Sequence, residues 1–538
     1  GSGQELAHLL AQVAGPGRGL EIVSNVNGIP KGSRLAVSTN LLGALIAVCM
    51  RATGQTASLT GPLTESERRI VASRAILGEW LGGSGGGWQD SGGVWPGIKL
   101  IEGCAAEPGD PEYGISRGRL LPRHRILDRE AVPDVSRSAL AESLILVHGG
   151  MAQNVGPILE MVTEKYLLRS ADAWQGRVEA LTYLDEILAA LKSGDIRRLG
   201  EITTRNFRGP LQRIIPWATN HYTETLIQRM QAAFGGQFWG FWMLGGMSGG
   251  GMGFMVDPAV REAAKAELQR VMLEEKQRLQ HALPFAMDPV VYDFAINESG
   301  SAASLLQDAA ALMPARYYAQ ALPGWVQADP RSRSPAREAE LTRLASASRN
   351  AADFADLVPQ LFAQLLPGGN AGDEKTAGLN DLLQEIGFDA QQQEDVRRQL
   401  TAGQLGLARN RLPQNTRIED VPASLVVTAA ELEAADEALG REALQRGEVG
   451  VITLAAGTGS RWTQGAGVVK ALHPFCRLQG RHRSFLEVHL AKSRRVGQAA
   501  GTMPAHLFTT SYLTHGPIAA ALAAADAFGY SGPLRLSK

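Results

Sequence analysis

Apolar residues recur at every third or fourth position in two stretches of the first half of the chain, Gly156 to Leu168 and Val178 to Leu191. This spacing predicts amphipathic helices. Two short apolar runs nearer the start, Leu144 to His148 and Gly97 to Ile101, have the length and composition that are typical of strands. The mixture favours an α+β domain over a helical bundle or a repeat array.

The pattern changes further along the chain. A charged stretch punctuated by prolines, Gln327 to Arg337, ends the first part. Polar sequence with a helical pattern follows from Glu338 to Arg411, with amphipathic segments at Asp381 to Ile386 and Val396 to Leu407. We therefore predict a first domain over residues 1–328 and a helical connector or accessory region over residues 329–446.

The last part of the chain begins with an apolar strand, Val449 to Leu454, that runs directly into a glycine turn. This arrangement opens many nucleotide-binding α/β domains. A second apolar run, Ala505 to Thr510, follows after a helical stretch, Ser484 to Val496. Because strands joined by a helical crossover are parallel, these two strands should pair side by side. We predict the opening strands of a Rossmann-like α/β domain over residues 447–538.

The charge and cysteine content exclude several classes of protein. The 53 Lys and Arg residues balance 54 Asp and Glu residues, so no overall field would attract nucleic acid or an anionic membrane. The three cysteines are widely spaced and match neither a zinc motif nor a disulfide framework. Leu41 to Met50 is about half the length that spans a bilayer. These features predict a cytoplasmic protein whose partners are small molecules, and they leave its oligomeric state open.

Glycine is concentrated in three places, Gly82 to Gly93, Gly245 to Gly253 and Gly457 to Gly459. Such clusters mark tight turns or positions where the backbone approaches a ligand closely. Flexible linkers are the alternative, but linkers are usually flanked by polar sequence. Here the flanking runs are apolar, which favours ligand-binding turns.

A loop of small residues, Gly28 to Val37, lies between an apolar run that we expect to be a strand, Leu20 to Val26, and a helix that should begin near Ser38. The N-terminus of a helix presents unpaired N–H groups and a positive dipole end, which suit a phosphate group. An ordinary helix start with Ser38 or Thr39 as its cap is the alternative.

The stretch from Glu79 to Lys99 contains Trp88-Gln89-Asp90 and ends in Pro96-Gly97-Ile98-Lys99. It resembles the fucokinase branch of the GHMP kinases. Over about residues 4 to 320, two further motifs resemble that family in the same order. These are an ATP loop that keeps Pro30, Gly32, Ser33, Leu35 and Ser38, and a last glycine motif that includes Gly249, Gly250 and Gly251.

The resemblance implies an α+β GHMP kinase fold and an ATP-dependent sugar kinase. It places Asp90 where a carboxylate orients the sugar hydroxyl and accepts its proton. It implies a magnesium ion that is held by Ser38 and Glu79 together with the ATP phosphates. A solvated position for Glu79 and a turn role for Asp90 are the structural alternatives. The nucleotide would contact Pro30, Gly32, Ser33, Arg34, Leu35, Ser38, Thr39, Gly249, Gly250 and Gly251.

The ATP loop departs from the family pattern at three positions. Arg34 and Ala36 replace glycines, and Val37 replaces a small hydroxyl residue. A side chain where the loop needs positive φ or close phosphate approach would strain or block it, although Arg34 could itself contact phosphate. The family's early Gly-Gly-Trp-Ser/Thr-Asp motif has no counterpart before residue 20. We therefore expect either a fragment of a longer protein or a degenerate kinase.

The segment from Val451 to Trp462 resembles the signature of sugar-1-phosphate nucleotidyltransferases. Two other stretches, Ala408 to Pro413 and Leu507 to Ser511, resemble the UDP-sugar pyrophosphorylase group. The resemblance implies that the loop around Gly457 and Gly459 holds UTP or another nucleotide. It also implies that Arg461 neutralises the triphosphate and Lys470 stabilises charge at the α-phosphate. A generic dinucleotide-binding fold is the alternative. Because the match stops at Lys538, we expect this segment to be inactive alone.

Together the two resemblances imply a transferase that makes a sugar-1-phosphate with ATP and Mg²⁺ and then activates it to a nucleotide sugar. Two alternatives remain open. One is a pseudokinase, a binding module that keeps the fold while Arg34 and Val37 block ATP, and the other is a UTP-sugar-1-phosphate uridylyltransferase with a scaffold N-terminal region. The identity of the sugar does not follow from the sequence.

Overall fold

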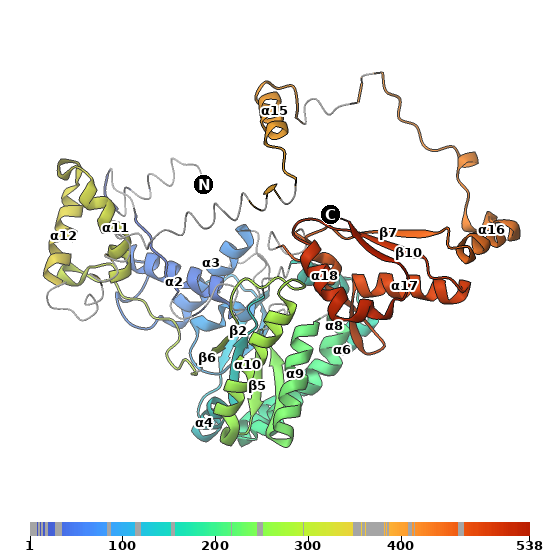
Figure 1. Ribbon diagram of the computed structural model, residues 1–538. Helices are drawn as coiled ribbons and strands as arrows, with labels where there is room; N and C mark the ends of the chain where they lie inside the picture. Colours follow the sequence, from blue (N-terminus) through green and yellow to red (C-terminus); the bar gives the residue numbers. More distant parts are fainter. Residues whose placement is uncertain are drawn as a thin grey trace. The chain divides into compact units, whose positions relative to one another are not determined.

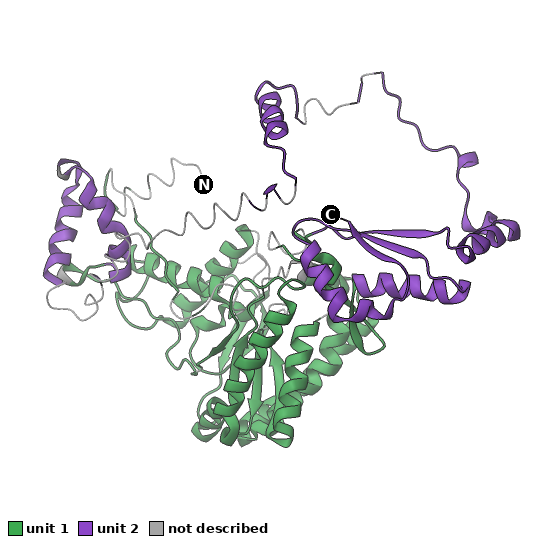
Figure 2. Cartoon of the chain, in the orientation of Figure 1, with its two compact units in different colours: residues 1–312, 458–485 green, residues 313–457, 486–538 purple. Residues whose placement is uncertain are grey.

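The computed structural model describes residues 8, 11, 14–16, 20–26, 29, 35–82, 88–112, 120–151, 156–216, 218–244, 251–293, 295–347, 357, 361, 381, 383–384, 387–406, 412–413, 415–460 and 467–537. The chain forms two compact units (Figure 2). Unit 1 comprises Gly1–Leu312 and Thr458–Phe485, and unit 2 comprises Met313–Gly457 and Leu486–Lys538.

Unit 1 contains both helices and strands (Figure 1). Its described helices are α2 (Val37–Ala52), α3 (Glu65–Leu81), α4 (Asp134–Ser143), α5 (Gly156–Leu167), α6 (Ala171–Ser193), α7 (Ile196–Asn206), α8 (Gln212–Ile214), α9 (His221–Phe234) and α10 (Arg261–Leu279). Its described strands are β1 (Lys99–Ala105), β2 (Leu120–Ile126), β3 (Leu144–His148), β4 (Phe238–Met243), β5 (Met252–Val256), β6 (Val290–Tyr292), β8 (Pro474–Leu478) and β9 (Arg481–Ser484).

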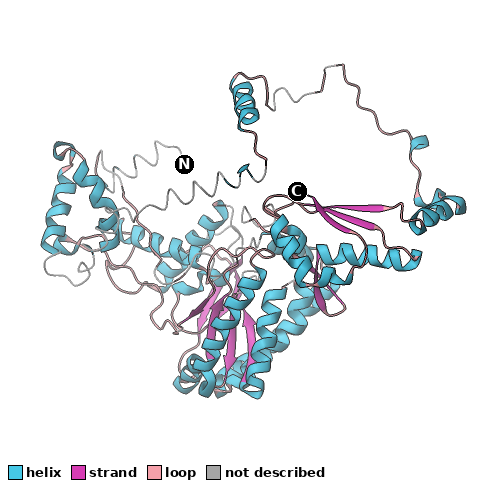
Figure 3. Ribbon diagram, in the orientation of Figure 1, coloured by secondary structure: helices cyan, strands magenta, loops and turns pink. Residues whose placement is uncertain are grey.

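The central sheet of unit 1 is antiparallel, with the strand order β4-β5-β3-β6. Helices lie beside its strands (Figure 3), and α9 and α10 share a core with them. On α9 the buried residues Tyr222, Leu226 and Met230 are four positions apart, so one face of the helix packs into this core.

A second layer is formed by α2, α3 and the 3₁₀ turn η1 (Trp88–Val94). Thr64 and Glu67 form a capping box at the start of α3. The carboxylate of Glu65 accepts a hydrogen bond of 2.8 Å from the indole N–H of Trp95, which is buried with Val94 and Val71. The start of α3 therefore fixes the end of η1.

Unit 2 contains a parallel sheet with the strand order β11-β10-β7. His506 on β10 is 1% exposed and shares hydrogen bonds with Thr453 (2.9 Å) and Ser493 (3.0 Å). The described elements of unit 2 are α11 (Ala315–Gln327), α12 (Pro335–Ala347), α15 (Ala390–Thr401), α16 (Ala434–Gln445), β7 (Gly450–Leu454), α17 (from Leu486 to Ala500 of Phe485–Ala500), β10 (Ala505–Thr509), α18 (His515–Ala524) and β11 (Leu534–Ser537).

Several sequence predictions are confirmed at the level of single elements. The predicted strand Leu144 to His148 is β3, and the predicted helices are α5 and α6. The predicted parallel pair is β7 with β10, where Ala505 lies opposite Gly450, and α17 is the predicted helix between them. The α+β character of the first part is therefore correct.

The expected strand at Leu20 to Val26 is wrong. The described residues 20–26 have no regular secondary structure and are exposed, including Leu20 at 50% and Ile22 at 59%. Apolar content alone does not make a strand, because the backbone groups need a ladder partner. Half of the predicted helix Asp381 to Ile386 lies outside the described residues, and its described residues 381, 383 and 384 are helical. Val396 to Leu407 overlaps α15, which starts earlier because the Asp389 side chain caps it.

No helix among the described residues combines the length and the apolar character needed to cross a membrane.

Tyr222 provides a test of the unit 1 core. Its side chain is fully buried, and its hydroxyl has no hydrogen-bond partner among the described residues. Tyr222→Phe should stabilise unit 1 by about 1 kcal/mol, because it removes an unsatisfied buried polar group without changing the ring. Thermal unfolding measures this. Tyr183→Phe is the control and should not stabilise the protein, since the Tyr183 hydroxyl donates to Glu179. A lower melting temperature for Tyr222→Phe would contradict the prediction.

Candidate functional site

The helix α2 begins at a residue in the left-handed conformation. Its N-cap is Ala36, with φ 54° and ψ 34°, and no side chain caps the helix within the described residues. The alternative in which Ser38 or Thr39 caps the helix is therefore wrong. Ala36 stands where the family pattern has a glycine. The positive φ that this position was expected to need is confirmed, and an alanine in this conformation is strained.

A buried hydrogen bond joins α2 to α3. The hydroxyl of Thr39 donates to Oε1 of Glu79 over 3.1 Å, and the two residues are 2% and 6% exposed. The predicted metal pair was Ser38 and Glu79, and Ser38 is exposed at the start of α2. The solvated position for Glu79 is wrong, while the pairing with Ser38 stays a prediction.

Asp90 is half-buried within η1, and its turn is anchored from two directions. The ammonium group of Lys99 on β1 donates to the carbonyl oxygens of Gly92 and Trp95, each over 2.8 Å. From α2, the side-chain amide of Asn40 donates to the Asp90 carbonyl oxygen over 3.1 Å. Burial is the larger cause that lowers the pKa of Lys99, followed by the charge of Arg68.

The structure thus places the start of α2, the Glu79 carboxylate and the Asp90 turn next to one another. Asn40 was missed by the sequence analysis. An asparagine inside a predicted helix carries no signal that its amide faces a turn 50 residues away. Lys99 belongs to the Pro96–Lys99 motif, so its anchoring role was accessible from that motif.

A cavity of about 400 Å³ lies beside the predicted ATP loop. Leu35 of that loop lines the cavity together with Ile29, Leu146, Val290, Val291, Tyr292, Asp293 and Ala295. The lining comes from β3, β6 and the described part of the loop. Leu35 thus lines a cavity, and its contact with a nucleotide stays a prediction.

Seven predicted site residues lie outside the described residues. They are Pro30, Gly32, Ser33, Arg34, Gly249, Gly250 and Arg461. Gly251 is described, and its carbonyl oxygen accepts the N–H of Leu244 over 3.0 Å at the start of the antiparallel β4–β5 pair.

The predicted nucleotidyltransferase residues fall into different units. Gly457 belongs to unit 2, while Gly459 and Lys470 belong to unit 1. Gly459 has φ 62°, as expected for a glycine turn. The ammonium group of Lys470 lies 6.0 Å from the ring centroid of Phe485. We call Thr458–Phe485 the loop–hairpin segment.

Described residues of the loop–hairpin segment contact α9 and the turn that follows α10 within unit 1. The Val469 N–H donates to the His281 carbonyl oxygen over 2.7 Å. Glu224 on α9 lies 3.1 Å from the imidazole of His482 and 3.4 Å from the guanidinium of Arg477. Burial alone would raise the pKa of Glu224, but hydrogen bonds from His482 and Thr219 hold it below its usual value. No pattern in the sequence predicts this contact.

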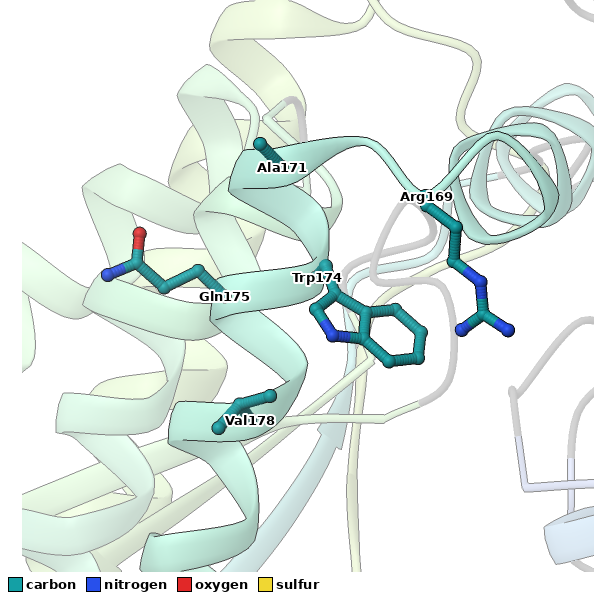
Figure 4. A pocket seen from close by; sticks show the side chains of 5 residues that line it. All are labelled: Arg169, Ala171, Trp174, Gln175 and Val178. Atoms are coloured by element: carbon teal, nitrogen blue, oxygen red, sulfur yellow. The ribbon is translucent and has the colours of Figure 1, made fainter.

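A larger hollow of about 820 Å³ is lined by Arg169, Ala171, Trp174, Gln175 and Val178 (Figure 4). The guanidinium of Arg169 lies 4.2 Å from the ring centroid of Trp174 and covers one face of the indole. This hollow contains none of the predicted site residues.

No group of three or more His, Cys, Asp and Glu side chains in the described part of the chain is arranged to hold a metal ion. The oxygens of Thr39 and Glu79 are hard donors, which is the ligand type that magnesium prefers. The donor set therefore fits a magnesium ion.

No family model matches this sequence. The chain is 28% identical over 259 residues to the bifunctional fucokinase/GDP-fucose pyrophosphorylase of Arabidopsis thaliana. This match includes 48% of the chain and 21% of the relative, so the chain spans about a fifth of the relative's length. The similarity confirms the resemblance to a fucokinase that the Trp88 to Lys99 stretch indicated.

Two solved structures of low identity also match. The L. major mevalonate kinase is 14% identical, with a TM-score of 0.32 over 49% of this chain and 67% of that chain. The Lactococcus lactis galactokinase is 12% identical, with a TM-score of 0.34 over 52% of this chain and 69% of that chain.

Ala36→Gly tests the strain at the start of α2. Glycine adopts a left-handed conformation without the steric penalty, so the substitution should stabilise unit 1 by about 1 kcal/mol. Ala44→Gly is the matched control on the exposed side of the same helix and should destabilise it by about 1 kcal/mol. Thermal unfolding measures both. If Ala36→Gly destabilises the protein as much as the control, Ala36 is not strained.

His124→Phe tests an acid-sensitive contact near η1. The His124 ring stacks on Trp95 at 3.5 Å, and burial first and the Lys99 charge second lower its pKa from 6.5 to about 4. The unfolded chain therefore binds a proton that the folded chain rejects, and stability falls as the pH drops from 6.5 toward 4. Phenylalanine keeps the stacking without titrating. Unfolding midpoints measured across this range should fall less steeply in the variant, and equal slopes would exclude a contribution from His124.

Proposed function

We propose that this chain, which resembles the fucokinase branch of the GHMP kinases, contains an ATP-dependent kinase that phosphorylates the anomeric hydroxyl of a sugar. The observation that carries the proposal is the approach of the Asp90 turn to the start of α2, held by Asn40 and Lys99. The similarity to a relative named for fucokinase activity supports it.

In the proposed reaction the sugar hydroxyl oxygen attacks the γ-phosphorus of ATP. The bond from that phosphorus to the β–γ bridging oxygen breaks, ADP leaves, and Asp90 accepts the hydroxyl proton. The start of α2 would hold the phosphates with backbone N–H groups and its positive dipole end. Most of the rate would come from positioning and from charge neutralisation.

A magnesium ion, when bound, would supply charge neutralisation at the phosphate oxygens. Glu79 and the hydroxyl groups at the start of α2 would hold it, with Ser38 as the predicted ligand and Thr39 as the hydroxyl that contacts Glu79. Cavity-lining Leu35 and the glycine segments would surround the nucleotide.

The second part of the proposal concerns residues 447–538, which would belong to a nucleotidyltransferase that converts the sugar-1-phosphate to a nucleotide sugar. It is supported by the strand and glycine turn at β7 and by the relative's pyrophosphorylase name. That name specifies GDP-fucose, whereas the local motif resembles the UDP-sugar group. The second nucleotide is therefore GTP or UTP, and the sugar is fucose or a related sugar.

A pseudokinase is the second candidate, because Ala36 introduces strain into the loop that would bind ATP. Separate measurements of ATP, UTP and GTP binding distinguish these functions. A kinase binds ATP and transfers its phosphate, whereas a pseudokinase with a blocked loop binds no ATP. Binding of UTP or GTP without ATP would leave only the nucleotidyltransferase.

Asp90→Asn tests the catalytic assignment. The substitution should abolish sugar phosphorylation while ATP affinity changes by no more than about threefold, because the carboxylate acts on the hydroxyl and not on the nucleotide. Phosphate transfer from labelled ATP to a panel of sugars, with ATP affinity measured by calorimetry, gives both values. Asp172→Asn, at an exposed carboxylate on α6, is the control and should leave both unchanged. Loss of ATP binding together with turnover would assign Asp90 a structural role.

A further inference from the structure

We propose that Asn40 is a positioning residue that sets the distance between the start of α2 and the turn that carries Asp90. This inference rests on the proposed kinase function. It adds a residue that the sequence motifs did not single out, and it concerns how the phosphate-binding and proton-accepting parts of the site are kept in register.

Asn40 uses one side-chain nitrogen to join two segments. Its Nδ2 donates to the Ala36 carbonyl oxygen over 2.8 Å and to the Asp90 carbonyl oxygen over 3.1 Å. A carboxamide nitrogen carries two hydrogens, so each hydrogen has one acceptor. Because both acceptors are backbone carbonyls, the amide orientation is fixed by its partners, and the two segments cannot separate without breaking a hydrogen bond.

The contact also holds the strained start of the helix. The Ala36 carbonyl accepts the Asn40 backbone N–H over 3.1 Å in addition to the side-chain amide. Asn40 thus donates twice to a residue in the left-handed conformation. Strain of this kind persists only where surrounding contacts determine the backbone, and Asn40 supplies two of them.

Gly93 gives an independent observation of the same close approach. An ideal Cβ atom on Gly93 would lie 2.2 Å from Oδ1 and 3.1 Å from Nδ2 of Asn40. The Asn40 side chain therefore occupies the space that any side chain at position 93 would need. Glycine at this position leaves room for the bridge between α2 and η1.

The Asn40 bridge joins two segments that would bind different parts of the reactants. Phosphate would bind at the start of α2, and the sugar hydroxyl would lie at Asp90. A displacement of about 1 Å between reacting groups can reduce a rate about 100-fold. Asn40 would therefore act on turnover through geometry, without touching the substrate.

A double-mutant cycle on Asn40→Ala and Gly93→Ala tests the bridge. Each single substitution should lower kcat about 10- to 100-fold, with the sugar KM changed by no more than about threefold. Gly93→Ala acts by displacing the Asn40 side chain. In a protein that already carries Asn40→Ala it should therefore lower kcat little further. Gly43→Ala on α2 is the matched control. A Cβ there would meet its nearest atoms at an ordinary 3.6 Å, so kcat should be unchanged.

Hydrogen exchange separates this inference from the proposed function. If the unsubstituted chain phosphorylates no sugar, the kinase proposal fails, but the bridge still predicts faster amide exchange at residues 88–95 and 37–41 in Asn40→Ala. Exchange in β3 and β5 should be unchanged. Unchanged exchange near η1, purely additive effects in the cycle, or a loss of global stability that accounts for the whole change in kcat would each overturn the assignment.

Discussion

The buried hydrogen bond between Thr39 and Glu79 is the constraint on which the arrangement of the site depends. A carboxylate that is only 6% exposed is costly unless donors reach it, and Thr39 is a donor that reaches it from the first turn of α2. The bond therefore fixes the first turn of α2 against the last turns of α3. With that turn in place, Asn40 faces η1 and the proposed phosphate site lies beside Asp90.

The start of α2 shows local preference and tertiary structure in conflict. Right-handed helical φ and ψ are favourable for alanine, and the left-handed region is sterically unfavourable. Ala36 nevertheless adopts the left-handed conformation. The contacts made by Asn40 and the packing of α2 outweigh this cost. Local rules are most often violated where a site needs a particular geometry, and here the violation coincides with the loop that the motifs assigned to ATP.

The elements that were predicted correctly share a physical property, which is that their pattern is local. The apolar run of β3 and the β7–α17–β10 crossover are specified by residues that are adjacent in sequence. The roles of Thr39 and Asn40 depend on how α2 packs against α3 and η1. That packing brings together residues that are separated by 40 positions (Thr39 and Glu79) and by 50 positions (Asn40 and Asp90). The prediction of a strand at Leu20 to Val26 failed because a strand depends on its partner as well as on its own composition.

The loop–hairpin segment has a consequence for how such a chain could have been assembled. Residues Thr458–Phe485 belong to unit 1, although the residues on both sides of them belong to unit 2. Parts of a chain can be exchanged without loss of stability only when each product keeps its own contacts. Here an exchange of everything after residue 457 would remove the partners of Glu224 and His281 from unit 1. Unit 1 therefore includes more than residues 1–312, and a recombination near residue 457 would remove contacts that it uses.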